Sequence, residues 1–169
     1  MSFQQRTTGL LAALALVLPA STHAQTSSSE LLSSLSFRHI GVVGNRIASV
    51  AGVAGNPLVY YAGAASGGLW KTEDGGVRWR PLFDELDVHS VGALAVSLSD
   101  PQIVWAGTGE PQNRQSSSWG NGVYRSTDAG MSWTHIGLQN THHISRIQVH
   151  PRDPEVAYVA AVGHLWGSN

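Results

Sequence analysis

A polar segment in the middle of the chain holds the side chains best suited to ligand chemistry. It spans residues 109–121, between two segments of strand-like alternation, and contains Glu110, Asn113, Arg114 and Trp119. The corresponding segment of an earlier repeat is much shorter. Because insertions between regular elements most often serve binding, we predict that these four residues contact a ligand.

Two more polar residues, Asn45 and Arg46, are expected on the same face, in a connection that precedes the first repeat. The predicted ligand is a protein, a peptide or a carbohydrate. Arg114 is expected to behave as an ordinary surface residue, so its replacement by alanine should change stability by less than about 0.5 kcal/mol.

Glu110 also raises the question of hydrolysis. Glycoside hydrolysis normally needs two carboxyl groups at a controlled separation. The other acids expected on this face are Asp84, Glu85 and Asp87, and they read as an exposed connection. We therefore assign no catalytic residue and favour binding without catalysis, with a glycosidase-like hydrolase as the alternative.

Several other chemistries are excluded or disfavoured. The 169 residues include no cysteine, which excludes disulfides, thiolate metal sites, cysteine nucleophiles and a lipid-modified cysteine. A net charge of −1 argues against nucleic-acid binding by bulk charge. The adjacent His142 and His143 should point apart if they lie on a strand, so we expect no metal site. No phosphate loop, calcium loop or nucleophile elbow is present, and no cofactor is expected.

The elements that position these residues are organised by an internal repeat. A hydroxyl-x-Asp-x-Gly-x-x-Trp pattern occurs at 72–79 and again at 126–133. A second register, Asn/Asp-Pro followed by apolar residues, begins at Asn56, Asp100 and Asp153. Three copies are therefore expected, the last one incomplete.

The repeated turn has a structural logic. Its aspartate can accept a hydrogen bond from a backbone N–H two residues on, its glycine can adopt positive φ, and its tryptophan can wedge against the sheet. We therefore assign structural roles to Asp74, Gly76, Trp79, Asp128, Gly130 and Trp133.

Alternation with a period of two predicts four strands in the middle copy, at 91–97, 103–107, 122–126 and 132–138. Four antiparallel strands in about 50 residues, repeated along the chain, are typical of a β-propeller blade. The predicted fold is all-β: an incomplete β-propeller built from four-stranded antiparallel blades.

The pattern divides the chain into three parts. Residues 1–24 have the layout of a signal peptide, because the apolar run at 10–18 is too short to span a bilayer. A serine-rich tether follows at 25–35. The partial propeller spans 36–169, with a leading fourth strand, full blades at 47–83 and 88–138 and a truncated blade at 144–169. The mature protein is expected in the periplasm or outside the cell, without stable membrane insertion.

The chain resembles a known family in five short segments, namely residues 37–41, 67–72, 107–110, 119–124 and 163–167. These segments and the repeated turns look like those of secreted bacterial BNR-repeat, or Asp-box, propeller proteins of glycosyl-hydrolase-like and sortilin-N-terminal-like type. Asp-boxes also occur in sialidases and in xyloglucan-cleaving glycoside hydrolases. The resemblance implies a propeller fold and Asp-box turns.

The same resemblance bears on activity and on partners. In the xyloglucan-cleaving relatives a catalytic aspartate precedes the Gly-Gly that corresponds to Gly67-Gly68, whereas this chain has Ala65-Ser66 there. A propeller needs roughly four to eight blades, more than this chain supplies. We therefore expect a fragment or truncated relative of a longer protein, whose partners are the remaining blades or further copies of itself.

Overall fold

The computed structural model describes residues 33, 42 and 46–168. The chain divides into two compact units, Met1–Arg38 and His39–Asn169, and the described strands all belong to the second. Apart from Ser33 and Val42, the predicted signal peptide, tether and leading fourth strand lie outside the described residues, as does Asn45.

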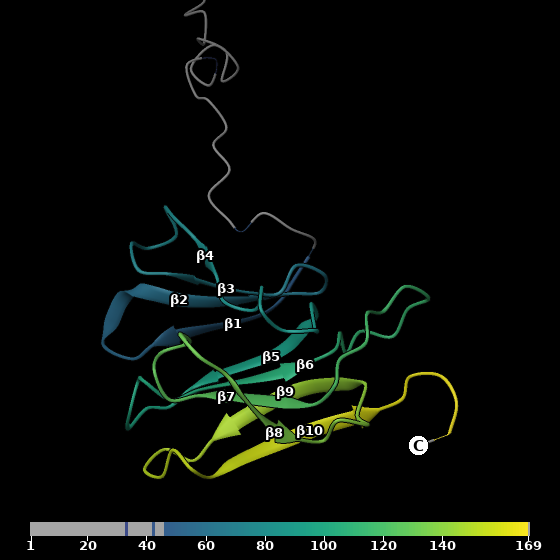
Figure 1. The fold of residues 1–169 in the computed structure, drawn as a ribbon. Coiled ribbons are helices and arrows are strands. Elements are labelled where there is room, and N and C mark those ends of the chain that lie inside the picture. Colours follow the sequence, from purple (N-terminus) through teal and green to yellow (C-terminus); the bar gives the residue numbers. More distant parts are fainter. Residues whose placement is uncertain (1–32, 34–41, 43–45, 169) are drawn as a thin grey trace, which may run out of the picture. The chain divides into compact units, whose positions relative to one another are not determined.

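Three antiparallel sheets make up the described part of the chain (Figure 1). The first sheet has the order β1-β2-β3-β4, the second β5-β6-β7-β8, and the third pairs β9 with β10. The strands are β1 Ile47–Val53, β2 Asn56–Ala64, β3 Leu69–Thr72, β4 Arg80–Pro81, β5 Val91–Val96, β6 Val104–Thr108, β7 Val123–Ser126, β8 Thr134–Gly137, β9 His143–Val149 and β10 Ala157–Gly163. The prediction of an all-β fold with antiparallel sheets is confirmed.

The repeated turns are closed by their own side chains. Thr72 Oγ1 accepts a hydrogen bond from the N–H of Gly76 at 2.9 Å, and Asp74 Oδ1 accepts one from the N–H of Arg78 at 2.9 Å. The aspartate therefore binds the N–H four residues on, and the predicted offset of two was wrong. The hydroxyl before the aspartate satisfies the glycine N–H instead.

The second turn repeats this arrangement. Ser126 Oγ accepts from the N–H of Gly130 at 2.7 Å, and Asp128 Oδ1 accepts from the N–H of Ser132 at 2.8 Å. Hydrogen bonds from the side chain and main chain of Ser132 lower the pKa of Asp128 to about 2. Gly130 has a φ of 89° and Gly76 a φ of 96°, as the sequence predicts.

The apolar core lies between neighbouring sheets. The cluster between the first two sheets contains Tyr61, Leu69, Phe83, Val91, Val104, Ala106 and Tyr124. The cluster between the second and third contains Ala93, Trp105, Val123, Ile144, Ile147 and Val149. The sheets are therefore stacked, and each face of the second sheet packs against a neighbouring sheet, although its last strand, β8, is mostly exposed.

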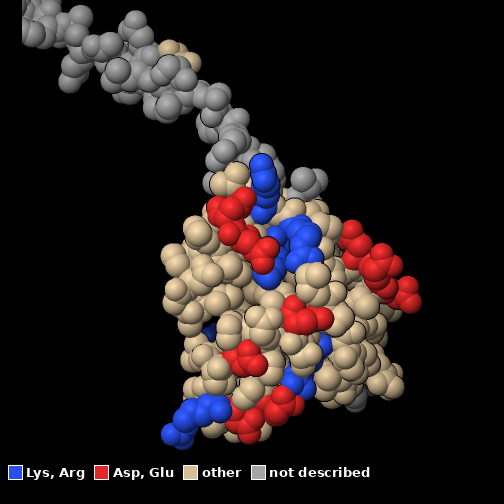
Figure 2. Space-filling model, turned by 60° about the vertical axis from the view of Figure 1, so that its left-hand side comes forward, with Lys and Arg blue, Asp and Glu red and all other residues tan. Residues whose placement is uncertain are grey.

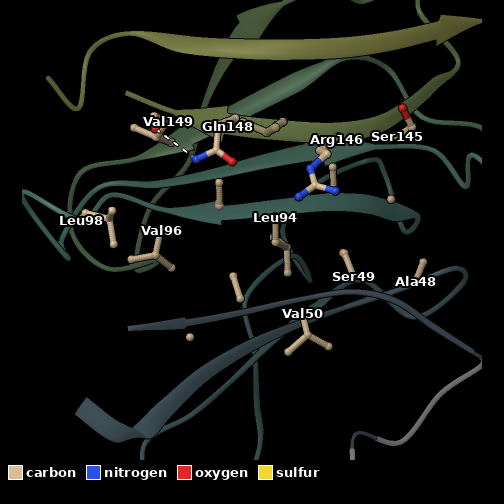
Figure 3. Close-up of a pocket in the computed structure, with 16 residues that line it drawn as sticks. Ala48, Ser49, Val50, Leu94, Val96, Leu98, Ser145, Arg146, Gln148 and Val149 are labelled. Carbon is tan, nitrogen blue, oxygen red and sulfur yellow. Dashed lines mark hydrogen bonds between the residues drawn. The ribbon is translucent and has the colours of Figure 1, made fainter. Parts of the chain in front are cut away.

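The first strands of the three sheets lie next to one another. Residues of β1, β5 and β9 surround a hollow of about 440 Å³ (Figure 3). Arg146 extends from β9 toward β5 in this view, and Gln148 contacts the carbonyl of Val149 on its own strand. This arrangement matches the order of a propeller, whose sheets surround a central channel.

Substitution of the half-buried Trp133 tests this packing. Its ring meets Phe83 edge-on with 5.1 Å between centroids, and it packs against the first core cluster. We expect Trp133→Ala to lower the free energy of unfolding by about 2–4 kcal/mol, because it removes a large contact from the core. Met131→Ala, at an exposed position in the same turn, should change it by less than about 0.5 kcal/mol. Chemical denaturation measures both, and equal effects would contradict the assigned packing.

Candidate functional site

The long loop of the second sheet is held against the connections between sheets. It joins β6 to β7 over residues 109–122. The N–H of Gly109 donates to the carbonyl of Ser90 at 2.9 Å, and the N–H of Gly120 donates to that of His142 at 2.8 Å. The shorter loop of the first sheet is placed in the same way, because the N–H of Gly67 donates to His89 at 2.9 Å. These loops and connections form one surface, which we call the loop face.

Glu110 forms the charged centre of the long loop. Its side chain is 3% exposed and is ion-paired with Arg114 in the same loop. Arg46, from the connection before β1, places its Nε 3.5 Å from the same carboxylate oxygen. The N–H of Ser118 lies 3.5 Å from the other oxygen. The structure thus brings three of the predicted site residues together, with both arginines paired to the Glu110 carboxylate.

The pKa of Glu110 bears on which role its carboxyl group could take in hydrolysis. Burial alone would raise the pKa of Glu110, but the hydrogen bonds from Arg114 and Ser118 and the charges of both arginines together hold it below its usual value. A general acid in glycoside hydrolysis needs a raised pKa, whereas the second carboxylate of such a site acts in its ionised form. The lowered pKa of Glu110 therefore argues against a role as general acid.

Trp119 gives the loop face an aromatic platform. The residue is 64% exposed, and its ring stacks on His142 with 4.5 Å between centroids. His142 in turn stacks on His164 at 3.9 Å, so two imidazoles support the indole. Burial and the charge of His164 lower the pKa of His142, which favours the neutral ring. His143, the first residue of β9, is buried, and its ring lies 6.0 Å from that of His142 at an interplanar angle of 79°.

A groove of about 330 Å³ adjoins Trp119. Its lining comes from the first sheet's short loop, the connection to the second sheet and the end of the long loop. These residues are Ala65, Ser66, Asp87, Val88, His89, Ser90, Ser118, Trp119, Gly120 and Asn121. Ser90 is buried and its hydroxyl has no hydrogen-bond partner, whereas the hydroxyls of Ser66 and Ser118 bind each other at 2.9 Å.

The groove includes residues that the sequence did not single out as ligand contacts. Among the predicted contacts, Trp119 lines it and Asn113 is exposed on the loop. Ser90 was missed, because its position depends on contacts between distant segments and carries no pattern. His142, which lies under the Trp119 ring, was considered from the sequence only as a metal ligand. Ser66 was noted only as a departure from the catalytic motif.

Charged side chains and histidines are distributed over the described residues. Figure 2 brings forward the side that lies on the left in Figure 1, and there Lys/Arg and Asp/Glu side chains are interspersed among uncharged residues. Within the described residues, no group of three or more histidine or acidic side chains is arranged to hold a metal ion. The same part of the chain contains no helix with the length and apolar character that crossing a bilayer requires.

Comparisons with known proteins identify the fold. No protein-family model matches the chain, and no curated protein matches it significantly. Among solved structures, an ancestral GH74 enzyme is similar with a TM-score of 0.56 at 18% identity, over 70% of this chain and 16% of that one. The GH74 enzyme of Niastella koreensis gives 0.54 at 23% identity, over 71% and 18%. The GH74 xyloglucanase of Xanthomonas campestris gives 0.52 at 22%, over 70% and 20%.

These similarities support a glycosyl-hydrolase-like propeller fold for the described sheets. The chain spans a fifth or less of the length of each of these three structures. The finer resemblance to BNR-repeat and sortilin-like proteins stays a prediction.

The pairing of Arg114 with a buried carboxylate corrects the expectation that Arg114 is an ordinary surface residue. Arg114→Ala should lower the free energy of unfolding by about 1–3 kcal/mol, because the buried Glu110 carboxylate then loses one of the two arginines that offset its burial. Asn113→Ala, at an exposed neighbouring position, is the control and should change it by less than about 0.5 kcal/mol. Equal and small losses in urea denaturation would show that the ion pair contributes nothing.

The lowered pKa of Glu110 also predicts a pH dependence. Because the pKa is lower in the folded than in the unfolded chain, the stability from Glu110 is fully present above the unfolded pKa of about 4.3 and is lost as the pH falls through the folded value. Unfolding free energies measured from neutral pH into this acid range should therefore fall less steeply for Glu110→Gln than for the unmodified chain. Parallel curves would contradict the assigned ionisation.

Proposed function

We propose that the loop face binds a glycan in the groove beside Trp119 without hydrolysing it. The observation that carries this proposal is the exposed indole of Trp119, backed by His142 at 4.5 Å, at the edge of a groove that Ser66 and Ser118 also line. The proposal assumes that the chain is exported, as the predicted signal peptide implies.

The groove offers the two kinds of contact that a sugar ring needs. The apolar C–H face of a sugar can lie on an indole, which provides a large contact area at low cost in conformational entropy. Sugar hydroxyls need polar partners, and a buried hydroxyl without a partner costs about 1–3 kcal/mol. The Ser66 and Ser118 hydroxyls line the groove and could exchange their mutual bond for bonds to the ligand.

The ion pairs of Glu110 argue against its use as the general acid of a hydrolase. Its carboxylate is buried, paired with Arg114 and Arg46, and held ionised by a lowered pKa. The acid that lines the groove is Asp87, an exposed residue in the connection between sheets. At the place where the resemblance to xyloglucan-cleaving enzymes implies an aspartate, the chain has Ala65-Ser66.

A second candidate function is participation in a glycoside-hydrolase-like enzyme. The structural similarity to GH74 enzymes favours it, since one of them is named a xyloglucanase. In that case the catalytic acids would belong to other parts of the protein, and the groove would hold substrate.

Binding of xyloglucan oligosaccharides tests the first proposal, and calorimetry provides the affinity. We expect Trp119→Ala to weaken binding by about tenfold or more, because it removes the stacking surface. Trp166→Ala removes a similarly exposed indole outside the groove and should leave the affinity unchanged.

A reducing-sugar assay on the same oligosaccharides tests whether this chain hydrolyses them by itself. Binding without release of reducing ends is the result expected of the non-catalytic proposal. Robust turnover that is lost in Glu110→Gln would overturn it, and would also contradict the structural role given to that carboxylate.

A further inference from the structure

Three aromatic rings from distant segments are stacked on the loop face. The indole of Trp119, in the long loop, lies on the imidazole of His142 with 4.5 Å between centroids and 20° between planes. His142 precedes β9, and it stacks in turn on His164, which follows β10, at 3.9 Å and 24°. The middle ring, His142, therefore has a nearly parallel neighbour on either side. We call these three side chains the ring stack.

A main-chain and a side-chain hydrogen bond hold the ring stack in place. The N–H of Gly120 donates to the carbonyl of His142 at 2.8 Å, which fixes the residue after Trp119 beside the middle ring. His164 Nε2 lies 3.1 Å from the carbonyl oxygen of Asn140. Because a carbonyl only accepts, Nε2 carries a proton, and Nδ1 is the nitrogen of His164 that can take up another. Both histidines are partly buried, so Trp119 is the exposed end of the stack.

Positive charge is disfavoured inside the ring stack. Burial and the charge of His164 both lower the pKa of His142. Two imidazolium rings that face each other at 3.9 Å would repel strongly, because rings in stacking contact leave no room for water to screen their charges. When the rings separate, each gains water and the repulsion falls. The separated arrangement therefore takes up protons more readily than the stacked one.

The charged groups around the ring stack do not compensate an added proton. On β9, the ring of His143 lies 6.0 Å from that of His142, and burial is the main cause that lowers the pKa of His143. From the long loop, the charge of Glu110 acts on His143 in the opposite sense, but this carboxylate is already paired with Arg114 and Arg46. A proton on the stack thus meets further imidazoles and a carboxylate whose charge is already offset.

We propose that the ring stack is a pH-sensitive support, closed in neutral solution and opened in mildly acidic solution by protonation of its histidines, which releases the indole of Trp119. As the pH falls, an equilibrium between two arrangements shifts toward the one that binds more protons. Because the pKa of His142 is lowered in the stack, the stability of the closed arrangement is fully present above the ordinary pKa of 6.5 and is lost as the pH falls through the lowered value. Release of Trp119 also weakens glycan binding, a consequence that rests on the proposed function.

The fluorescence of Trp119 in the full chain tests the ring stack without a ligand. Subtracting the spectrum of Trp119→Phe from that of the unmodified chain isolates this indole among the six tryptophans. We expect the difference to change between about pH 7.5 and about pH 5, with a midpoint below 6.5, because the released indole exchanges a ring contact for water. This range lies above the one in which Glu110, with its lowered pKa, takes up a proton.

Three variants locate the titrating group, each compared with the same variant carrying Trp119→Phe. His142→Phe keeps a ring under the indole without a titratable group, so its difference spectrum should not depend on pH. His164→Phe removes the facing charge and should reduce the change. His89→Gln removes an exposed imidazole that lines the groove outside the stack and should leave the change intact, and the acid of that lining, Asp87, is retained throughout. Circular dichroism at neutral pH verifies that each variant is folded.

Calorimetry with xyloglucan oligosaccharides measures the consequence for binding. The affinity of the unmodified chain should fall by about fivefold or more between the two pH values, at the lower end of typical coupling between two binding events, and that of His142→Phe should not. Constant fluorescence over this range, a change that persists in His142→Phe, or a change that His89→Gln abolishes would each overturn the proposal. A chain that shows the expected fluorescence change but binds no oligosaccharide at neutral pH would contradict the proposed function and still support the pH-sensitive stack.

Discussion

The close approach of neighbouring sheets is the constraint on which the rest of the structure depends. Gly63 of β2 and its repeat counterpart Gly107 of β6 lie at equivalent positions. A Cβ at Gly63 would come within 2.7 Å of Val91, and one at Gly107 within 2.4 Å of Ile144. Interiors packed this densely tolerate little added volume, so both positions require glycine. A glycine at the same repeat position thus allows the close approach of the sheets at both interfaces.

The spacing of the sheets in turn assembles the loop face. The N–H of Gly109 donates to the carbonyl of Ser90, in the connection between the first and second sheets. The N–H of Gly120 donates to the carbonyl of His142, in the connection between the second and third. The groove is therefore shared between two sheets, and Trp119 is supported by His142 from the entry to the third. Ligand contacts on such a surface are positioned by core packing and not by the loop sequence alone. This explains why a loop rich in serine and glycine can hold an aromatic platform in a defined orientation.

Local pattern predicted much of the fold and less of the site. The expected strand at 91–97 is observed as β5, Val91–Val96, because alternation reports directly which side chains face a core. The expected strand at 132–138 begins later, at Thr134, because Ser132 binds Asp128 within the turn. The burial of Glu110 and the unpartnered hydroxyl of Ser90 could not be predicted in this way. Both depend on which distant segments meet, and a carboxylate in a polar loop looks the same in sequence whether it is exposed or paired.

The hydrogen bonding of the two repeated turns has a consequence for how the chain folds. The hydroxyl and the aspartate of each turn bind N–H groups within a window of a few residues, whereas the N–H groups of Gly75 and Ala129 donate to the carbonyls of Leu58 in β2 and Gln102 just before β6. All-β proteins fold slowly as a class, because segments far apart in the sequence must meet before their contacts stabilise the fold. The bonds made by Asp74 and Asp128 are local and need no such meeting. We therefore expect these two aspartates to favour early formation of the hairpin that joins the last two strands of each sheet.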